Sequence, residues 1–391
     1  MKIGIGLLVF AMALTACTDE TITDSGLDLS PKRGEDWLGP RDDGPALTVM
    51  TRNVYVGTNV DKIIEASSVQ EIPLLVAEAF ATLIATDFHQ RAHAFAREIA
   101  ETEPHLVGLQ EISTIRRQSP GDAIVGGTVL AEMVLFDYLD ILMDALETWG
   151  LDYRVAAIVK HADIEVPMLT GVNPLSSDDI RLTDFDVILA RGDVEISDVR
   201  ARNYMAKLTV PIGEGFAIDI PRGFTSVKAT VAGSSYRFVN THLEPAVLAI
   251  KEAQANELIG MLQNETLPVI LVGDLNTPAP DGMVYNMFLD AAYVDLWSDR
   301  VNAADGDGFT ANHDDDLRNE TIDLEKRIDF VLARNQPPGA RHRPTGAGGS
   351  VLGATFAIVV GDELQDRTPS GLWPSDHAGV VARIMAVPQF R

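Results

Sequence analysis

The chain has 391 residues, of which 46% are hydrophobic and 23% charged, which is an ordinary balance for a globular protein. Its formal net charge of −26 repels polyanions at long range and counts against an avid nucleic-acid binder, although not against a local basic cleft. The same charge is equally typical of a solvated acidic surface that keeps a protein soluble, and Cys17 as the only cysteine excludes an internal disulfide.

The N-terminus predicts export. Lys2 is followed by an apolar run over residues 3–14, which is too short to span a bilayer, and then by Thr15, Ala16 and Cys17. This arrangement resembles a bacterial lipoprotein signal, in which the cysteine becomes the acylated N-terminus; an ordinary secretory signal with an incidental cysteine is the alternative. We therefore expect a signal peptide at 1–16 and a lipidated Cys17 with a flexible tether at 17–46. Thr18 in the second mature position favours the outer membrane.

From residue 47 onward, short apolar runs alternate with helical stretches. The first strand is expected at 48–51, and apolar residues spaced i, i+3, i+4 and i+7 over 92–99 predict an amphipathic helix that Pro104 ends. A buried strand at 106–109 and a helix over 135–149, closed by Gly150, come next. Further strands are expected at 187–190, 204–210, 236–240, 269–272, 328–333 and 379–384, with a helix at 246–262. Strands interleaved with helices indicate one α/β domain over 47–391.

Four of these apolar runs stop abruptly at a carboxylate, an amide or an imidazole. The run endings are Asn53, Gln110-Glu111, Asn240-Thr241-His242 and Gly273-Asp274-Leu275-Asn276. Ligand sites in α/β sheets gather at strand ends, where rigid strands bring distant parts of the chain to one cleft. One such ending is ordinary punctuation between a strand and a loop, but four with this chemistry predict a site.

Two more segments carry the same residue types. Asp329 stands at the start of an expected strand, and Ser375-Asp376-His377 precedes the last one. Carboxylate and amide oxygens suit Mg²⁺, and without a cysteine ligand or a histidine-rich cluster a structural zinc site is not expected.

Taken in order, these six segments resemble the signature of the endonuclease/exonuclease/phosphatase superfamily, over nearly the whole mature domain. The resemblance implies a four-layer sandwich of two packed mixed β-sheets flanked by α-helices, with the site at one end. It also implies metal-dependent hydrolysis of a phosphoester with Mg²⁺, for which Mn²⁺ is a possible substitute.

The resemblance assigns roles on the metal side of the site. Glu111 would be the main Mg²⁺ ligand and Asn53 would help it, while Asp376 would support the metal region. Arg181, which precedes the strand at 187–190, is a further candidate for contact with the substrate, because arginine suits a phosphate.

The resemblance also assigns roles in proton transfer. Asp274 and Asn276 would orient or deprotonate the attacking water, and Asp329 would hold the tautomer of His377, which acts as a base or binds a phosphoryl oxygen. His242 would face the phosphate and stabilise charge or serve the leaving group. Which of Asp274 and His377 is the base stays open at this point.

These expectations favour a monomeric, lipid-anchored phosphodiesterase or phosphatase of the bacterial envelope that acts on a lipid headgroup or a small phosphoester. The alternatives are an envelope-anchored nuclease that degrades extracellular DNA or RNA, which needs a basic stripe beside the site, and a non-catalytic binding lipoprotein. A binding protein is expected to have lost some of the acidic or histidine positions, and none is lost here.

Overall fold

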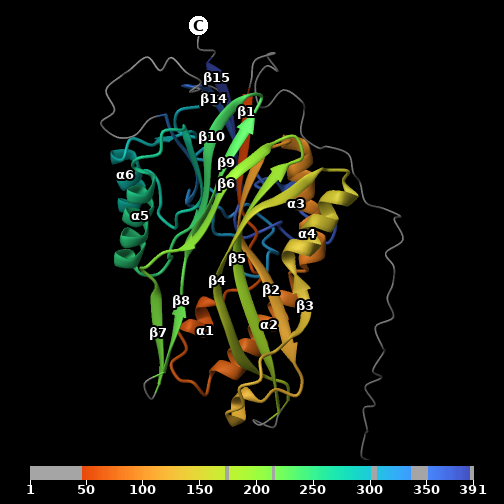
Figure 1. Cartoon of the computed structure of the whole chain (residues 1–391). Coiled ribbons are helices and arrows are strands. Elements are labelled where there is room, and N and C mark those ends of the chain that lie inside the picture. Colours follow the sequence, from red (N-terminus) through yellow and green to blue (C-terminus); the bar gives the residue numbers. More distant parts are fainter. Residues whose placement is uncertain (1–45, 172–175, 214–215, 301–305, 336–350, 388–391) are drawn as a thin grey trace, which may run out of the picture. The chain divides into compact units, whose positions relative to one another are not determined.

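The computed structural model of the chain describes residues 46–171, 176–213, 216–300, 306–335 and 351–387 (Figure 1). The expected signal peptide, Cys17 and all but the last residue of the expected tether lie outside these described residues.

The first sheet has seven strands in the order β14-β15-β1-β2-β5-β4, with β3 paired to β2. Its strands are β1 (Ala46–Asn53), β2 (Leu106–Gln118), β3 (Met133–Asp137), β4 (Tyr153–Leu169), β5 (Ser177–Arg191), β14 (Val351–Val360) and β15 (Gly379–Val387). β1 and β2 are parallel and the other pairs are antiparallel, so the sheet is mixed.

The second sheet has six strands in the order β12-β13-β11-β10-β9-β6, and only β10 and β11 are parallel. Its strands are β6 (Glu195–Asn203), β9 (Gly223–Val231), β10 (Ser234–His242), β11 (Val269–Asp274), β12 (Val294–Asp295) and β13 (Asp329–Arg334). A separate two-stranded ribbon is formed by β7 (Leu208–Gly213) and β8 (Phe216–Ile220).

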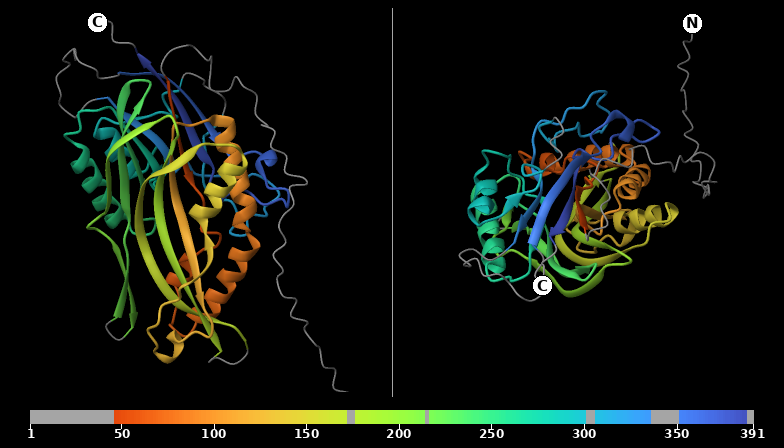
Figure 2. Two further views of the ribbon diagram at one scale, coloured as in Figure 1. Left: turned by 45° about the vertical axis from the view of Figure 1, so that its right-hand side comes forward. Right: turned by 90° about the horizontal axis from the view of Figure 1, so that it is seen from above.

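The outer face of the first sheet is covered by α3 (Phe88–Thr102) and α4 (Tyr138–Thr148), and that of the second sheet by α5 (Leu248–Leu262) and α6 (Met283–Asp290) (Figure 2). The two other helices of the described chain are α1 (Asp61–Ile64) and α2 (Ile72–Ala85), and α2 packs with Ile115 and Ile180 on the opposite face of the first sheet. Short 3₁₀ turns occur at Ala123–Val125 and Leu364–Asp366. Among the described residues, no single helix is long and apolar enough to cross a membrane; α2 and α3 reach that length only as a pair bent by 50°.

Apolar side chains bind these layers together. Phe95 of α3 and Leu142 of α4 pack against the first sheet, and Leu258 of α5 and Phe288 of α6 pack against the second. A third cluster lies between the two sheets. The order helix, sheet, sheet, helix confirms the expected four-layer sandwich of two mixed sheets.

The two sheets approach each other closely near the strand ends that form the candidate active site described below. A Cβ atom on Gly108 of β2 would lie 2.4 Å from Cγ2 of Val272 in β11, so only glycine fits there. Beside it, Asn240 of β10 donates from Nδ2 to the carbonyl of Leu109 at 2.9 Å and accepts from Nε2 of Gln110 at 2.6 Å. Buried amides therefore hydrogen-bond one sheet to the other just behind the strand ends.

Some element boundaries differ from the sequence expectation. The apolar run at 204–210 is not one strand: β6 ends at Asn203 and β7 begins at Leu208, because Tyr204 turns inward and hydrogen-bonds Thr241 at 2.8 Å. The helix expected from residue 135 begins at Tyr138, since Asp137 caps it by accepting from two backbone amides and the preceding residues pair as β3.

Candidate active site

Strand ends of the two sheets meet at Asn53. This residue is the last of β1, and its buried amide Nδ2 donates to Oε1 of Glu111 at 2.9 Å and to Oδ2 of Asp274 at 3.2 Å. Glu111 belongs to the first sheet and Asp274 to the second. One amide thus connects the two carboxylates across the sandwich and sets their separation.

Glu111 does not end its strand, as the sequence pattern had indicated, but lies within β2 at a bulge. Its φ is 62°, and the pairing with β5 passes from Leu109 directly to Ile112. A bulge re-aims a side chain that regular pairing would direct along the sheet. The second carboxylate oxygen, Oε2, accepts from the backbone amide of Val56 at 2.9 Å, so both oxygens of Glu111 are fixed.

Three site residues stand side by side in the second sheet. His242 is paired in register with Asp274, and Asp274 with Asp329. Gly273 allows the close pairing of β10 with β11 beside these residues, because its φ is 147° and a Cβ atom there would lie 1.8 Å from the carbonyl oxygen of Thr241. Nε2 of His242 lies 3.5 Å from Oδ2 of Asp274.

Asn276 follows the same strand and fixes the other oxygen of Asp274. Its backbone amide donates to Oδ1 of Asp274 at 2.8 Å, while its side-chain Nδ2 donates to the carbonyl of Leu243 at 3.0 Å. Lys251 of α5 donates to the carbonyl of Asn276. The loop after β11 is therefore held from both sides.

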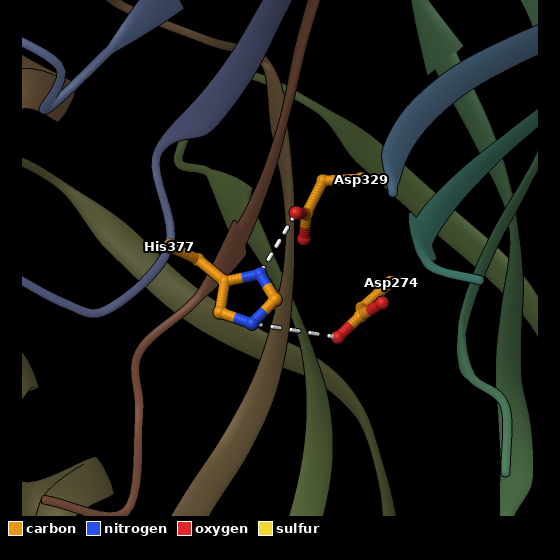
Figure 3. A group of neighbouring side chains, drawn as sticks. All are labelled: Asp274, Asp329 and His377. Atoms are coloured by element: carbon orange, nitrogen blue, oxygen red, sulfur yellow. Dashed lines mark hydrogen bonds and ion pairs between the residues drawn. The ribbon is translucent and has the colours of Figure 1, made fainter. Parts of the chain in front are cut away.

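His377 completes the centre from the segment before β15 (Figure 3). Its Nδ1 donates to Oδ2 of Asp329 at 2.8 Å, which leaves Nε2 directed at Asp274, 3.9 Å from Oδ2. Burial alone would lower the pKa of His377, but the neighbouring charges of Asp329 and Asp376 outweigh it and hold the pKa well above its usual value. The charges of these two acids therefore favour the imidazolium form of His377.

Two carboxyl groups of the centre have displaced pKa values. Burial, and then the charge of Asp329, raises the pKa of Asp274 to about 7. Burial also raises the pKa of Asp376 to about 7, and the charge of Glu111 adds to that shift. Buried carboxyl groups with raised pKa values are groups that a divalent cation would neutralise, so Asp274 and Asp376, together with Glu111 beside them, fit a hard metal ion.

A second oxygen and nitrogen set also lies close enough to hold an ion. Ligand atoms of Asp274, Asp329 and His377 lie within 4.8 Å of one another. The 2.8 Å hydrogen bond already joins His377 to Asp329, however, and a cation bound there would face an imidazolium. Charge therefore favours the Glu111 side, where Asn53 and Asp376 were expected to assist.

Arg222 is the cation that sequence reasoning missed. It precedes β9, and its Nη1 lies 3.0 Å from Nδ1 of His242 and 3.5 Å from Oδ2 of Asp184. Burial and the charge of Arg222 lower the pKa of His242 well below its usual value, so His242 is neutral and accepts at Nδ1. Only the hairpin of β9 and β10 could have pointed to Arg222 from the sequence, because it pairs Gly223, the residue after Arg222, with His242.

Arg181, in contrast, turns away from the site. It forms a fork with Asp163, with Nε 2.7 Å from Oδ1 and Nη2 2.8 Å from Oδ2. Its neighbours Ile180 and Leu182 line the cavity described below, so Arg181 lies on the opposite face of β5. Because side chains alternate between the two faces of a strand, Arg181 faces away from the cavity where it was expected to contact the substrate. The side chain of Asp184 faces the cavity, and burial raises its pKa to about 7.

Two cavities open on this centre and share Asn276, Asp376 and His377 in their walls. One, of about 540 Å³, extends from Glu111 and His242 toward α1, α2 and the β7–β8 ribbon and is largely apolar. The other, of about 980 Å³, is polar and lies against residues 311–316.

Comparison with known proteins agrees with this architecture. The model of the Endonuclease/Exonuclease/phosphatase family matches residues 80–377. Among curated protein sequences the chain has no significant match.

Solved structures with a similar course of the chain include three bacterial proteins. An endonuclease/exonuclease/phosphatase family protein from Leptotrichia buccalis is 14% identical, with 88% of this chain and 100% of that one covered and a TM-score of 0.49. A family protein from Bacteroides thetaiotaomicron is 17% identical, with 87% and 94% covered and a TM-score of 0.48. A mannosyl-6-phosphatase from the same species is 16% identical, with 88% and 100% covered and a TM-score of 0.47.

Proposed function

From the premise that the chain belongs to the endonuclease/exonuclease/phosphatase family, whose members are divalent-metal-dependent hydrolases of phosphate esters, we propose an Mg²⁺-dependent phosphodiesterase or phosphatase of the bacterial envelope. Its substrate is a lipid headgroup or a small phosphoester. The observation that carries the proposal is the meeting of Glu111, Asp274, His242 and the His377–Asp329 pair at one point between the sheets.

Mg²⁺ held by Glu111 with Asn53 and Asp376 would neutralise charge that develops on the phosphoryl oxygens. Mn²⁺ could replace it, since both ions take oxygen ligands. The fixed oxygens of Glu111 and the raised pKa of Asp376 support this assignment.

The side chains divide the proton chemistry. Asp274, whose Oδ1 is held by the amide of Asn276 and whose Oδ2 faces Nε2 of His242 and of His377, accepts a proton from the attacking water. The water oxygen bonds to phosphorus, the ester P–O bond breaks, and the alcohol oxygen leaves with a proton from solvent. His377 as an imidazolium and His242 through Nε2–H hold phosphoryl oxygens in the transition state. This division favours Asp274 over His377 as the base.

A nuclease is the other candidate, and the charge near the site disfavours it. The polar cavity is lined by Asp314, Asp315 and Asp316, and these carboxylates repel a polyanionic strand.

The test is a substrate panel on the purified chain: phospholipids, sphingomyelin, inositol phosphates and duplex DNA, each with Mg²⁺ and with EDTA. We expect metal-dependent release of phosphate or a phosphorylated headgroup, and activity confined to DNA would overturn the proposal. The anchor is tested separately by incorporation of radioactive palmitate into the chain in bacteria, which Cys17→Ser should abolish.

A further inference from the structure

The part of the 540 Å³ cavity that lies between Ile115, Leu182, Phe80 and Val210 has no role in the chemistry just described, because its walls are apolar. We propose that this part, here called the apolar chamber, binds the hydrocarbon chain of an amphiphilic phosphoester while its phosphate lies at the catalytic centre. The inference rests on the proposed function and adds a substrate class and a binding site to it.

The sheet floor of the chamber changes from polar to apolar with distance from the centre. Along β2 the side chains that line it are Glu111, Ser113 and Ile115, and in the register with β5 Ser113 faces Asp184 while Ile115 faces Leu182. The next strand continues the row, because Leu182 also pairs with Ile164 of β4. A molecule lying along this floor meets acids at one end and hydrocarbon at the other.

The roof is one face of α2. Val76, Ala79, Phe80 and Leu83 line the chamber, and their spacing of i, i+3, i+4 and i+7 places them on a single stripe. A stripe of this kind ordinarily packs directly onto a sheet. Here Val76 and Leu83 do pack with Ile115 and Ile180 of the sheet, but the stripe also borders the cavity that opens on the catalytic residues.

The β7–β8 ribbon forms a side wall (Figure 1). Its inner face presents Leu208, Val210 and Ile220 to the chamber, whereas Lys207 and Thr209 on the outer face bond to Asp219. The two strands pair only with each other within the described part of the chain. Because a lone two-stranded ribbon is marginally stable, a hydrocarbon against its inner face would also support it.

The size of the chamber agrees with this occupant. Protein interiors have few voids larger than a water molecule, and an apolar cavity of about 150 Å³ already binds one benzene molecule. A cavity of about 540 Å³ therefore accommodates a phosphate together with an alkyl chain of several carbons. Water gains few partners among these side chains, so an alkyl group displaces it favourably.

The experiment compares ethyl and octyl 4-nitrophenyl phosphate as substrates of the full chain, below micellar concentration and without detergent, since detergent tails would compete. We expect kcat/KM to be roughly 50-fold higher for the octyl ester, about twofold per added methylene, where complete burial gives about fourfold. Equal kcat/KM values for the two esters would overturn the inference even if both are hydrolysed.

Ala79→Trp fills the chamber, and Ala81→Trp is its matched control, because Ala81 is exposed on α2 and does not line the cavity. We expect Ala79→Trp to lower the octyl-to-ethyl ratio at least tenfold, and Ala81→Trp to keep both the wild-type ratio and the wild-type rate on the ethyl ester. An unchanged ratio in a folded Ala79→Trp contradicts the inference. If that variant does not fold, as judged by circular dichroism, Ala79→Met takes its place.

A binding measurement separates this inference from the proposed function. Calorimetric titration of octyl phosphate and ethyl phosphate into the EDTA-treated chain needs no turnover. Tighter octyl binding that Ala79→Trp abolishes supports the chamber even if neither ester is hydrolysed, whereas affinity independent of chain length overturns it.

Discussion

The two cavities beside the catalytic centre differ in both chemistry and construction. The apolar chamber is walled largely by regular elements, α2, β2, β4, β5 and the β7–β8 ribbon, whose repeating side-chain directions turn one face of each element toward the cavity. The polar cavity is bounded largely by irregular segments, including Ala311 to Asp316 and the residues before β15. Extended strands and helices can offer a continuous hydrocarbon surface, whereas loops need polar side chains for their free backbone groups.

The centre serves both cavities, so its loss should affect every substrate alike. We expect Glu111→Gln to lower kcat/KM by about 10³-fold for ethyl and octyl esters together, because the amide keeps the volume but removes the charge that holds the metal. Steady-state assays with increasing Mg²⁺ measure the effect.

His89→Gln is a suitable control for this change, since His89 is exposed on α3 away from the centre. A Glu111→Gln enzyme with wild-type activity at saturating Mg²⁺ would show that the metal lies elsewhere, and the Asp274, Asp329 and His377 group would then be the next site to test.

Arg222 should affect substrate affinity more than the chemical step. Arg222→Ala removes a cation beside His242, and we expect kcat/KM to fall about 30- to 100-fold, with partial recovery in Arg222→Lys. The loss should also free the pKa of His242 to rise, which a pH profile of kcat would record.

Arg181→Gln provides the matched control, because it removes an arginine on the opposite face of β5 whose partner is Asp163. We expect activity within about twofold of wild type, since a partly exposed ion pair contributes little beyond local stability. Equal losses in both variants would mean that general charge near β5, rather than position, determines binding.

These two arginines show what the sequence could and could not predict. Apolar runs that stop at acids and imidazoles predicted a site that brings together Asn53, Asp274 and the His377 region, because strand ends are marked locally, and they carried the family resemblance that implied the sandwich. The face of β5 on which Arg181 lies depends on the bulges and on the register of β2, β4 and β5. The local sequence pattern around Arg181 does not predict either of them.

The same limit explains the element that the sequence did not indicate. The apolar residues of α2 follow helical spacing, but their stripe borders a cavity as well as packing onto the sheet, and only the placement of β4 and β5 reveals that. Glu111 was found by its residue type, although its bulge within a longer strand was not.

Protonation of the centre should make stability depend on pH in the metal-free protein. Asp274 and Asp376 have folded pKa values of about 7 against ordinary values of 3.8, so the folded state binds more protons between about pH 4 and 7. Stability then falls as pH rises through that window, and we expect the melting temperature in EDTA to be about 2–4 °C higher at pH 5.5 than at pH 7.5.

Two comparisons check this sign. Asp376→Asn should flatten the slope, and saturating Mg²⁺ should reduce it, because the cation replaces the protons. The lowered pKa values of His242, His105 and His313 act in the opposite direction below the ordinary value near 6.5, so a melting temperature that rises from pH 5.5 to 7.5 in EDTA would mean that the histidines dominate.

The smallest effect is expected at the polar cavity, where charge acts through solvent. Asp314 and Asp316 are both exposed, so the double change Asp314→Asn with Asp316→Asn removes two screened charges. We expect KM for anionic esters to fall about two- to fivefold at low ionic strength, with the difference lost at high salt.

The octyl-to-ethyl ratio should stay at its wild-type value in this variant, because the two cavities contact different parts of one substrate. A ratio that changes together with KM would indicate that the hydrocarbon chain reaches the polar cavity, and would contradict its placement in the apolar chamber.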